Sequence, residues 1–251
     1  MTKPKKKPFI IGCSGWSYAD WRGIFYPKDL PMRLWFDYYQ QHFKVIEINA
    51  TFYRFFPKKV YLKWYAQADP GLMYVIKVPR VISHYKRLKN CKRLIKLFCK
   101  SANLLKDKLA LLLLQLPPSF QCDLLVLEKA ILSFDNPKKL VIEFRNKTWL
   151  TDETLTLLKK YGCTYCAADS PDSVLKVWVT SKTGYIRLHG RKEWFNYKYT
   201  KKELMEVAMI AKKMLKHGAM KVFILFNNDY YAYAVQNAKT IEIMLRNKVK
   251  L

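Results

Sequence analysis

The feature of this chain that most restricts its fold is an alternation of short apolar runs with longer amphipathic stretches. The apolar runs are rich in Val, Ile, Leu and Phe and end in Gly, Pro, Asn or Asp, as strands buried on both faces of a parallel sheet do. They cover residues 9–14, 45–50, 73–78, 109–116, 140–145, 163–169, 184–189 and 221–227.

Stretches with apolar residues at helical spacing separate these runs. They cover residues 31–43, 58–68, 90–105, 123–134, 151–161, 201–217 and 231–247. Thr151 suits a helix N-terminus, while Gly162 and Gly218 suit C-terminal stops. The interval 170–183 is too broken for a full helix, and 176–180 is a candidate for a small extra strand.

Strict alternation over 251 residues predicts an α/β protein with a single (β/α)8 TIM barrel. One crossover helix, between strands 6 and 7, is expected to be degenerate. A doubly wound open sheet is the alternative, but it calls for a Gly-rich nucleotide loop after an early strand, and residues 12–15 (GCSG) do not form one. No linker divides the chain, so we expect a basic tail at 1–8 and one domain at 9–251.

The charge of the chain indicates an anionic partner. Lys and Arg number 46 against 19 Asp and Glu, a formal net charge of +27. Such a surface attracts polyanions such as DNA, RNA or phosphorylated metabolites, although a basic exterior without a partner is the alternative. The longest charge-free run, 109–122, is too short to cross a bilayer. Six Cys, mostly in apolar runs, favour a reducing compartment. We expect a cytoplasmic protein without a membrane partner.

Polar residues follow one parity of the predicted strands, and in a barrel one parity points into the lumen. Side chains of this kind cannot face the helices without a large desolvation cost, so we expect them at the C-terminal mouth, where this fold places its active sites. An alternative is a lumen filled by ion pairs such as Glu143 with Arg145, or Glu47 with Lys77. The residues concerned are Ser14, Glu47, Asn49, Lys77, Gln115, Glu143, Arg145, Asp169, Arg187, His189 and Asn227.

The candidate catalytic residues are acids and a histidine that can transfer protons: Glu47, Glu143, Asp169 and His189. Candidate binding residues are cations, amides and rings: Trp16, Asn49, Tyr53, Lys77, Arg80, His84, Gln115, Arg145, Arg187, Arg191, Trp194, Asn227 and Asn228. Among them, Lys77, Arg145 and Arg187 can hold a phosphate or carboxylate. A single divalent ion on the carboxylates, Asn49 and His189 stays open, and the cofactor is otherwise unknown.

Aromatic residues crowd the predicted loops at the same face, interleaved with Arg and Lys. They follow strands one, two, seven and eight and include Trp16, Trp21, Phe52, Tyr53, Trp194, Phe195 and Tyr230. Aromatic faces beside cations are what unstacked bases on a phosphate backbone require, and sugar rings stack on them too. Cys163 and Cys166 resemble half a zinc site, but their spacing on a strand sends the two sulfurs to opposite faces.

Together these residues resemble the DUF72 (YecE-like) family over nearly the whole chain. The matching strings are 12–18 (GCSGWSY), 45–53 (VIEINATFY), 77–80 (KVPR), 83–88 (SHYKRL), 115–120 (QLPPSF), 143–145 (EFR), 168–171 (ADSP), 185–191 (YIRLHGR) and 226–229 (FNND). The resemblance implies a (β/α)8 barrel and no particular reaction. That barrel is similar to endonuclease IV-type enzymes, but this sequence lacks the histidines and carboxylates of their trinuclear zinc site.

Three functions remain open. The first is a barrel that binds nucleic acid and acts on, or inspects, an extruded nucleotide, with Glu47 or Glu143 as base and His189 as acid. The second is a small-molecule enzyme acting on a sugar, sugar phosphate or carboxylate, in which Lys77 can serve as a Schiff-base nucleophile. The third is a non-catalytic binding or scaffold protein. The oligomeric state stays open in each case.

Overall fold

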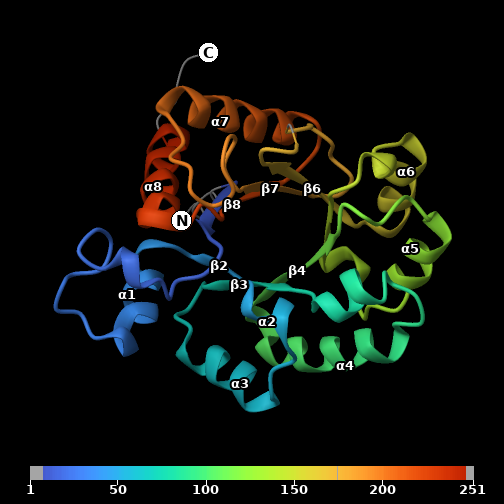
Figure 1. The fold of residues 1–251 in the computed structure, drawn as a ribbon, viewed down its shortest axis with the longest axis horizontal. Helices are drawn as coiled ribbons and strands as arrows, with labels where there is room; N and C mark the ends of the chain where they lie inside the picture. The colour runs from blue at the N-terminus through green and yellow to red at the C-terminus, as the bar shows by residue number, and fades with distance from the viewer. Residues whose placement is uncertain (1–7, 174, 247–251) are drawn as a thin grey trace, which may run out of the picture.

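The computed structural model describes residues 8–173 and 175–246. Most of the expected basic tail, 1–8, therefore lies outside the described residues. Within them, eight parallel strands close into a barrel in sequence order, which confirms the predicted (β/α)8 fold (Figure 1). The strands are β1 (Phe9–Cys13), β2 (Val45–Ile48), β3 (Met73–Lys77), β4 (Leu109–Leu116), β5 (Leu140–Phe144), β6 (Thr164–Asp169), β7 (Thr183–Leu188) and β8 (Lys221–Phe226).

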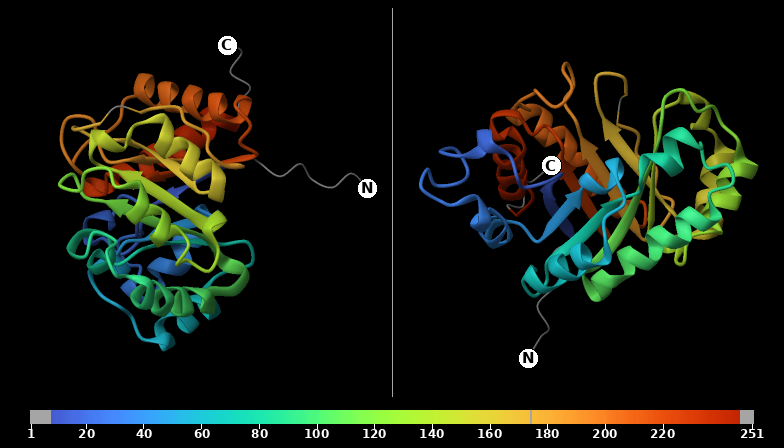
Figure 2. Two further views of the ribbon diagram at one scale, coloured as in Figure 1. Left: turned by 90° about the vertical axis from the view of Figure 1, so that its right-hand side faces the viewer. Right: turned by 60° about the horizontal axis from the view of Figure 1, so that its bottom comes forward.

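Helices surround the strands, because each has one apolar stripe to bury against the sheet. Both figures that show the whole fold place α7 and α4 on opposite sides of the strands (Figures 1 and 2). The helices are α1 (Trp35–His42), α2 (Ala50–Tyr53), α3 (Lys58–Gln67), α4 (Lys92–Ala102), α5 (Leu124–Ile131), α6 (Asp152–Tyr161), α7 (Lys201–Lys216) and α8 (Tyr233–Arg246). Among the described residues, no helix is long and apolar enough to span a membrane.

Helix ends follow the chemistry of their capping residues. Thr151 accepts a hydrogen bond from the backbone of Thr154 at the start of α6, and Gly162 ends that helix with a φ of 67°. Thr200 and Glu203 form a reciprocal capping box at the start of α7. The predicted start of the first helix, residue 31, is early: a 3₁₀ turn, Met32–Leu34, precedes α1.

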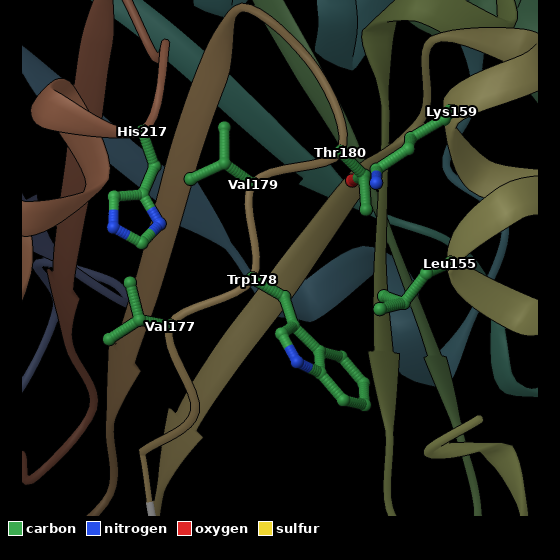
Figure 3. Close-up of a pocket in the computed structure, with 7 residues that line it drawn as sticks. All are labelled: Leu155, Lys159, Val177, Trp178, Val179, Thr180 and His217. Atoms are coloured by element: carbon green, nitrogen blue, oxygen red, sulfur yellow. The ribbon is translucent and has the colours of Figure 1, made fainter. Parts of the chain in front are cut away.

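The connection between β6 and β7 has no helix among its described residues, which agrees with the expected degenerate crossover. The extra strand expected at 176–180 is wrong: these residues carry no strand pairing, and Thr180 instead uses its hydroxyl to accept from the backbone of Tyr165. The segment lies over the outer surface between α6 and the end of α7. There it lines a pocket of about 370 Å³ with Leu155, Lys159 and His217 (Figure 3).

The lumen is filled in layers by inward-facing side chains, as in other barrels of this size. A lower apolar layer contains Val45, Val75, Leu111, Leu113, Val141, Cys166, Tyr185, Phe223 and Leu225. Gly12 takes the inward position on β1, where a Cβ atom would overlap the carbonyl oxygen of Val45. Two residues further along, the inward position is polar on every strand except β6, where it is Ala168, so the apolar layer supports a polar layer at the C-terminal end.

Candidate functional site

The deepest polar layer is a closed network around Arg187. Its Nε and Nη2 donate to the two carboxylate oxygens of Glu47 at 3.0 and 2.6 Å, and Nη1 donates to Glu143 at 2.6 Å. Ser14 and Tyr185 also donate to Glu47, each at 2.7 Å. All three charged side chains are fully buried. A guanidinium held on two sides by carboxylates is satisfied and is not available to a ligand.

Arg145 joins this network to the layer above it. It forms an ion pair with Glu143, which thus lies between Arg145 and Arg187. Burial alone raises the pKa of Glu143, but the two guanidinium groups outweigh it and hold that pKa well below its usual range. Glu143 is therefore an ionised, strongly held carboxylate. The ion pair Glu143–Arg145 that the sequence offered as an alternative is present, whereas Glu47 pairs with Arg187 and not with Lys77.

His189 lies beside Arg145 at the end of β7. The Nη2 of Arg145 donates to Nε2 of His189 at 2.9 Å, and the side-chain amide of Asn227 lies 2.9 Å from Nδ1. Asn49 donates in turn to Asn227 at 3.3 Å. Burial, with Arg187 nearby, lowers the pKa of His189 to about 3. The imidazole is thus neutral at pH 7 and accepts from Arg145, which is the wrong protonation state for the general acid expected from the sequence.

A short π-helix, Val81–Tyr85, brings a second group of residues to the mouth. Such helices interrupt regular geometry and occur often at functional sites. Arg80 is its N-cap residue, and the guanidinium carbon lies 5.4 Å from the ring centroid of Tyr53 and 5.3 Å from that of Tyr85. His84 contacts Phe52 edge-on with centroids 4.9 Å apart. Burial, with Lys77 and Arg80 next, lowers the pKa of His84 to about 4, so this ring is neutral as well.

Lys77 ends β3 and is 8% exposed. Its Nζ lies 4.2 Å from the centroid of the Phe52 ring. Among the described residues, no carboxylate lies within 4.0 Å of this nitrogen and no side chain or backbone group hydrogen-bonds to it. Burial, with Arg187 next, lowers the pKa of the Lys77 amine to about 7, although Glu143 and Glu47 oppose the shift.

These residues surround a cleft of about 1210 Å³ at the C-terminal ends of the strands, which we call the mouth cleft. Its cations are Lys77, Arg80, Arg145, Lys147 and Lys176. Its rings are Phe52, Tyr53, Tyr85, Phe144, Tyr165, Trp194 and Phe195. Among the described residues, Asp172 is the only acidic side chain lining it. The mouth cleft therefore presents positive charge and aromatic faces to a ligand.

Nine residues proposed from the sequence line the mouth cleft: Tyr53, Lys77, Arg80, His84, Gln115, Arg145, His189, Trp194 and Asn227. Glu47, Glu143 and Arg187 lie beneath it in the closed network, and Asn49 supports it through Asn227. The structure does not bring Trp16, Asp169, Arg191 or Asn228 to its lining.

Asp169 was expected to point inward, and this is wrong. Cys166 faces the lumen on β6, so the odd-numbered Asp169 has the opposite parity and faces the helices. Arg191 offsets the desolvation cost of the buried Asp169 carboxylate, because its Nε donates a hydrogen bond to that carboxylate at 2.9 Å. Arg191 also bonds Glu206 at 2.7 Å. Both residues belong to an ion-pair cluster with α7 and not to the cleft.

Trp16 and Asn228 have packing roles. Trp16 packs against Phe36 with ring centroids 5.1 Å apart, and the neighbouring rings after β1 are buried against each other in the same cluster. Aromatic composition alone could not separate this cluster from the mouth. Asn228 donates to the carbonyl of Tyr197 at 2.7 Å and to Asn237 at 2.9 Å, and so fastens the loop before α7 to α8.

The sequence argument did not single out Tyr85, Lys147, Lys176 and Tyr165, which also line the mouth cleft. The basic and aromatic residues after strand three were a signal for Tyr85. No periodic signal points to Lys176, because it lies in the irregular β6–β7 connection.

As for metals, no group of three His, Cys, Asp or Glu side chains comes together among residues 8–173 and 175–246. Cys163 and Cys166 lie in separate core clusters, as their spacing predicted.

Comparison with known proteins agrees with this architecture. The chain is 26% identical over 270 residues to UPF0759 protein YunF of Bacillus subtilis, covering 91% of this chain and 92% of that protein. The crystal structure of a DUF72 family protein from Thermotoga maritima matches with a TM-score of 0.86 at 26% identity, over 95% of this chain and 99% of the other.

A DUF72 family protein from Enterococcus faecalis has the same fold, with a TM-score of 0.82 at 21% identity over 96% of this chain and 97% of that one. The family model described as "Protein of unknown function DUF72" matches residues 10–251. Because that match spans nearly all of the sequence, the chain belongs to the DUF72 family.

Proposed function

We propose that the mouth cleft binds a phosphate-bearing ligand with a flat ring, and that this ligand is a nucleotide within single-stranded DNA or RNA. The observation that carries this proposal is the combination of five cations and one acid around a cleft walled by aromatic rings. Phosphate explains the cations and stacked bases explain the rings.

The anion contact falls to Arg145 and Arg80. Arg145 is 8% exposed, and its Nε and Nη1 have no hydrogen-bond partner among the described residues. Buried guanidinium N–H groups are costly to leave unpaired, so a ligand oxygen at this position relieves a real penalty. Arg80, which no carboxylate holds among the described residues, approaches the same space from the π-helix.

The ring contact falls to Trp194 and its neighbours. Arg145 lies 4.6 Å from the centroid of Trp194, so the indole is held in place from one side. The ring centroid of Phe195 lies 5.7 Å from that of Trp194, and the Tyr53 side chain is 64% exposed. Exposed and half-buried rings at a cationic cleft are suited to stacking on bases, which is tolerant of base identity.

The size and the surroundings of the cleft favour a polymer over a free metabolite. Pockets for single small ligands hold about 300–1,000 Å³, whereas the mouth cleft holds about 1210 Å³. The chain also carries a formal charge of +27, far more than one phosphate needs. The geometry favours binding over catalysis. Glu47 is saturated by hydrogen bonds and His189 is neutral, so neither is suited to be the base or the acid of a phosphodiester reaction.

Fluorescence anisotropy with labelled oligonucleotides tests this function. We expect single-stranded DNA or RNA to bind more tightly than a duplex of the same sequence. The logarithm of the association constant should fall linearly with the logarithm of salt concentration, with a slope of about −0.7 for each phosphate contacted.

Two cleft variants and one matched control locate the binding site. Trp194→Ala should weaken binding by about 5- to 150-fold, since base stacking contributes about 1–3 kcal/mol. Arg80→Ala should weaken it and flatten the salt slope by about 0.7. Arg93→Ala removes the same charge from the outer face of α4 and should change neither. Equal effects of all three variants, or an affinity that ignores salt, would overturn the assignment.

A further inference from the structure

The Lys77 amine has surroundings in the mouth cleft that the barrel fold alone does not explain. It is almost fully buried, and it has neither a carboxylate within 4.0 Å nor a hydrogen bond among the described residues. A buried ammonium without a partner costs stability, and a methionine of similar shape avoids that cost. We therefore look for a function of this nitrogen that justifies the cost of burying it.

We propose that the Nζ of Lys77 is a covalent nucleophile that forms an imine with the carbonyl group of a phosphate-bearing ligand. The position of this mostly buried lysine, in the lining of a cleft that Arg80 and Arg145 also line, carries this inference. It rests on the proposed function in one respect, because those two arginines are to hold the phosphate. The ligand class is narrower: a phosphorylated aldehyde or ketone, including the ring-opened sugar of a base-free nucleotide.

The surroundings of Lys77 favour the free amine, which is the reactive form. Burial disfavours a proton on this nitrogen most, and Arg187 from β7 repels it next. Glu143 and Glu47, which are paired with arginines, oppose the shift, and Arg145 after β5 adds a smaller repulsion. His84 faces the same space from the π-helix and is neutral, and Phe52 from α2 covers one side. The two glutamates thus hold the arginines in place instead of pairing with the lysine.

The resulting reactivity differs sharply from that of a surface lysine. An amine with a pKa of about 7 is half deprotonated at pH 7. An ordinary lysine, with a pKa of about 10.4, is deprotonated to less than about 0.1% at that pH. Lys77 therefore offers roughly a thousandfold larger fraction of nucleophile than the many exposed lysines of this chain.

The bond changes balance without an oxidant or reductant. The nitrogen lone pair attacks the carbonyl carbon, the C=O π electrons move to oxygen, and this oxygen takes a proton to give a carbinolamine. A second proton transfer to the hydroxyl lets water leave, and the protonated imine remains. Overall, a neutral amine, a carbonyl and one proton give an iminium ion and one water.

Borohydride trapping tests this inference on the full-length protein. The probes are dihydroxyacetone phosphate and dihydroxyacetone, which share the ketone and differ in the phosphate. Intact mass spectrometry counts adducts, and peptide mapping locates them. We expect one adduct, at Lys77, with dihydroxyacetone phosphate and much less with dihydroxyacetone. In wild-type protein the trapping rate at low probe concentration should rise with pH and reach half of its maximum near pH 7.

Two substitutions and a control keep the test independent of folding. Lys77→Arg keeps the positive charge and Lys77→Met keeps the shape, and both should abolish the adduct while circular dichroism stays that of the barrel. Lys63→Arg on the exposed face of α3 should leave trapping unchanged. Because the pH profile is measured on wild-type protein, the inference stays testable if both Lys77 variants fail to fold.

The outcomes separate this inference from the proposed function. Oligonucleotide binding that depends on Arg80 and Trp194, without an adduct at Lys77, overturns the nucleophile and leaves the nucleotide site standing. An adduct at Lys77 with both ketones, without oligonucleotide binding, supports the nucleophile and removes the phosphate site. Adducts spread over surface lysines with a midpoint near pH 10 overturn the nucleophile.

Discussion

Replacing Arg187 with methionine tests whether the closed network around Arg187 stabilises the barrel beneath the mouth cleft. The substitution removes the three hydrogen bonds that the guanidinium donates to Glu47 and Glu143 and leaves two fully buried carboxylates without their common partner. Breaking a buried pair from one side costs about 3–5 kcal/mol. A domain has only about 5–15 kcal/mol of total stability, so the variant should be near the limit of folding at pH 7.

The assay is urea unfolding followed by circular dichroism, with a surface ion pair as the control. Lys96→Met removes the pair with Asp135, whose side chains are 48% and 41% exposed. Exposed pairs contribute about 0–1 kcal/mol, so this variant should unfold close to the wild-type midpoint. Adding Glu47→Gln to Arg187→Met should recover part of the loss, because it removes one stranded charge.

The pH dependence follows from the depressed pKa of Glu143. Stability from a carboxylate with a lowered pKa in the folded state is fully present above the unfolded value, about 4.3, and is lost as the pH falls through the folded value. Wild-type protein should therefore lose stability below about pH 4. Because Arg187→Met weakens the cause of the low pKa, the gap between variant and wild type should narrow there. A loss of unfolding free energy in Arg187→Met no larger than that in Lys96→Met would refute a stabilising role of the closed network.

Three further substitutions test other parts of the structure. Lys77→Met should raise the free energy of unfolding at pH 6 by at most about 5 kcal/mol, at 1.36 kcal/mol per pKa unit. Because the unfolded lysine binds more protons than the folded one, the stability of the wild-type protein should rise between pH 7 and 10. Equal stability of the two proteins at pH 6 would contradict the low pKa. Gly12→Ala should lower the thermal midpoint strongly, because its Cβ overlaps the backbone of Val45, and an unchanged midpoint would mean that β1 can shift. Thr200→Ala removes the capping box of α7 and should cost about 1 kcal/mol in urea unfolding, with no loss of oligonucleotide binding.

Strand periodicity was sufficient to predict the barrel and most of the inward set of polar residues, with Asp169 as the exception. The inward parity of Glu47, Glu143 and Arg187 follows from a period of two that no tertiary contact overrides. Periodicity could not say which carboxylate pairs with which cation. Glu47 with Lys77 was an alternative on neighbouring strands, yet Arg187 wins because its planar fork bonds both oxygens of Glu47.

The sequence argument failed for Asp169 at the end of a strand and for Trp16 in a loop. Asp169 has the outward parity of β6 and is stabilised by Arg191, a residue of the loop after β7 that periodicity cannot place. Trp16 and Trp194 both follow strands in aromatic stretches, but only Trp194 reaches the mouth cleft among the described residues. The difference depends on packing against α1, which composition does not reveal.

The most direct measurement is a crystal structure of this protein with a short single-stranded oligonucleotide. We expect one phosphate within hydrogen-bond distance, about 2.7–3.2 Å, of Nε and Nη1 of Arg145, with a base stacked on Trp194. An oligonucleotide bound elsewhere on the surface, with the space above Arg145 filled by water, would contradict the assignment of the mouth cleft.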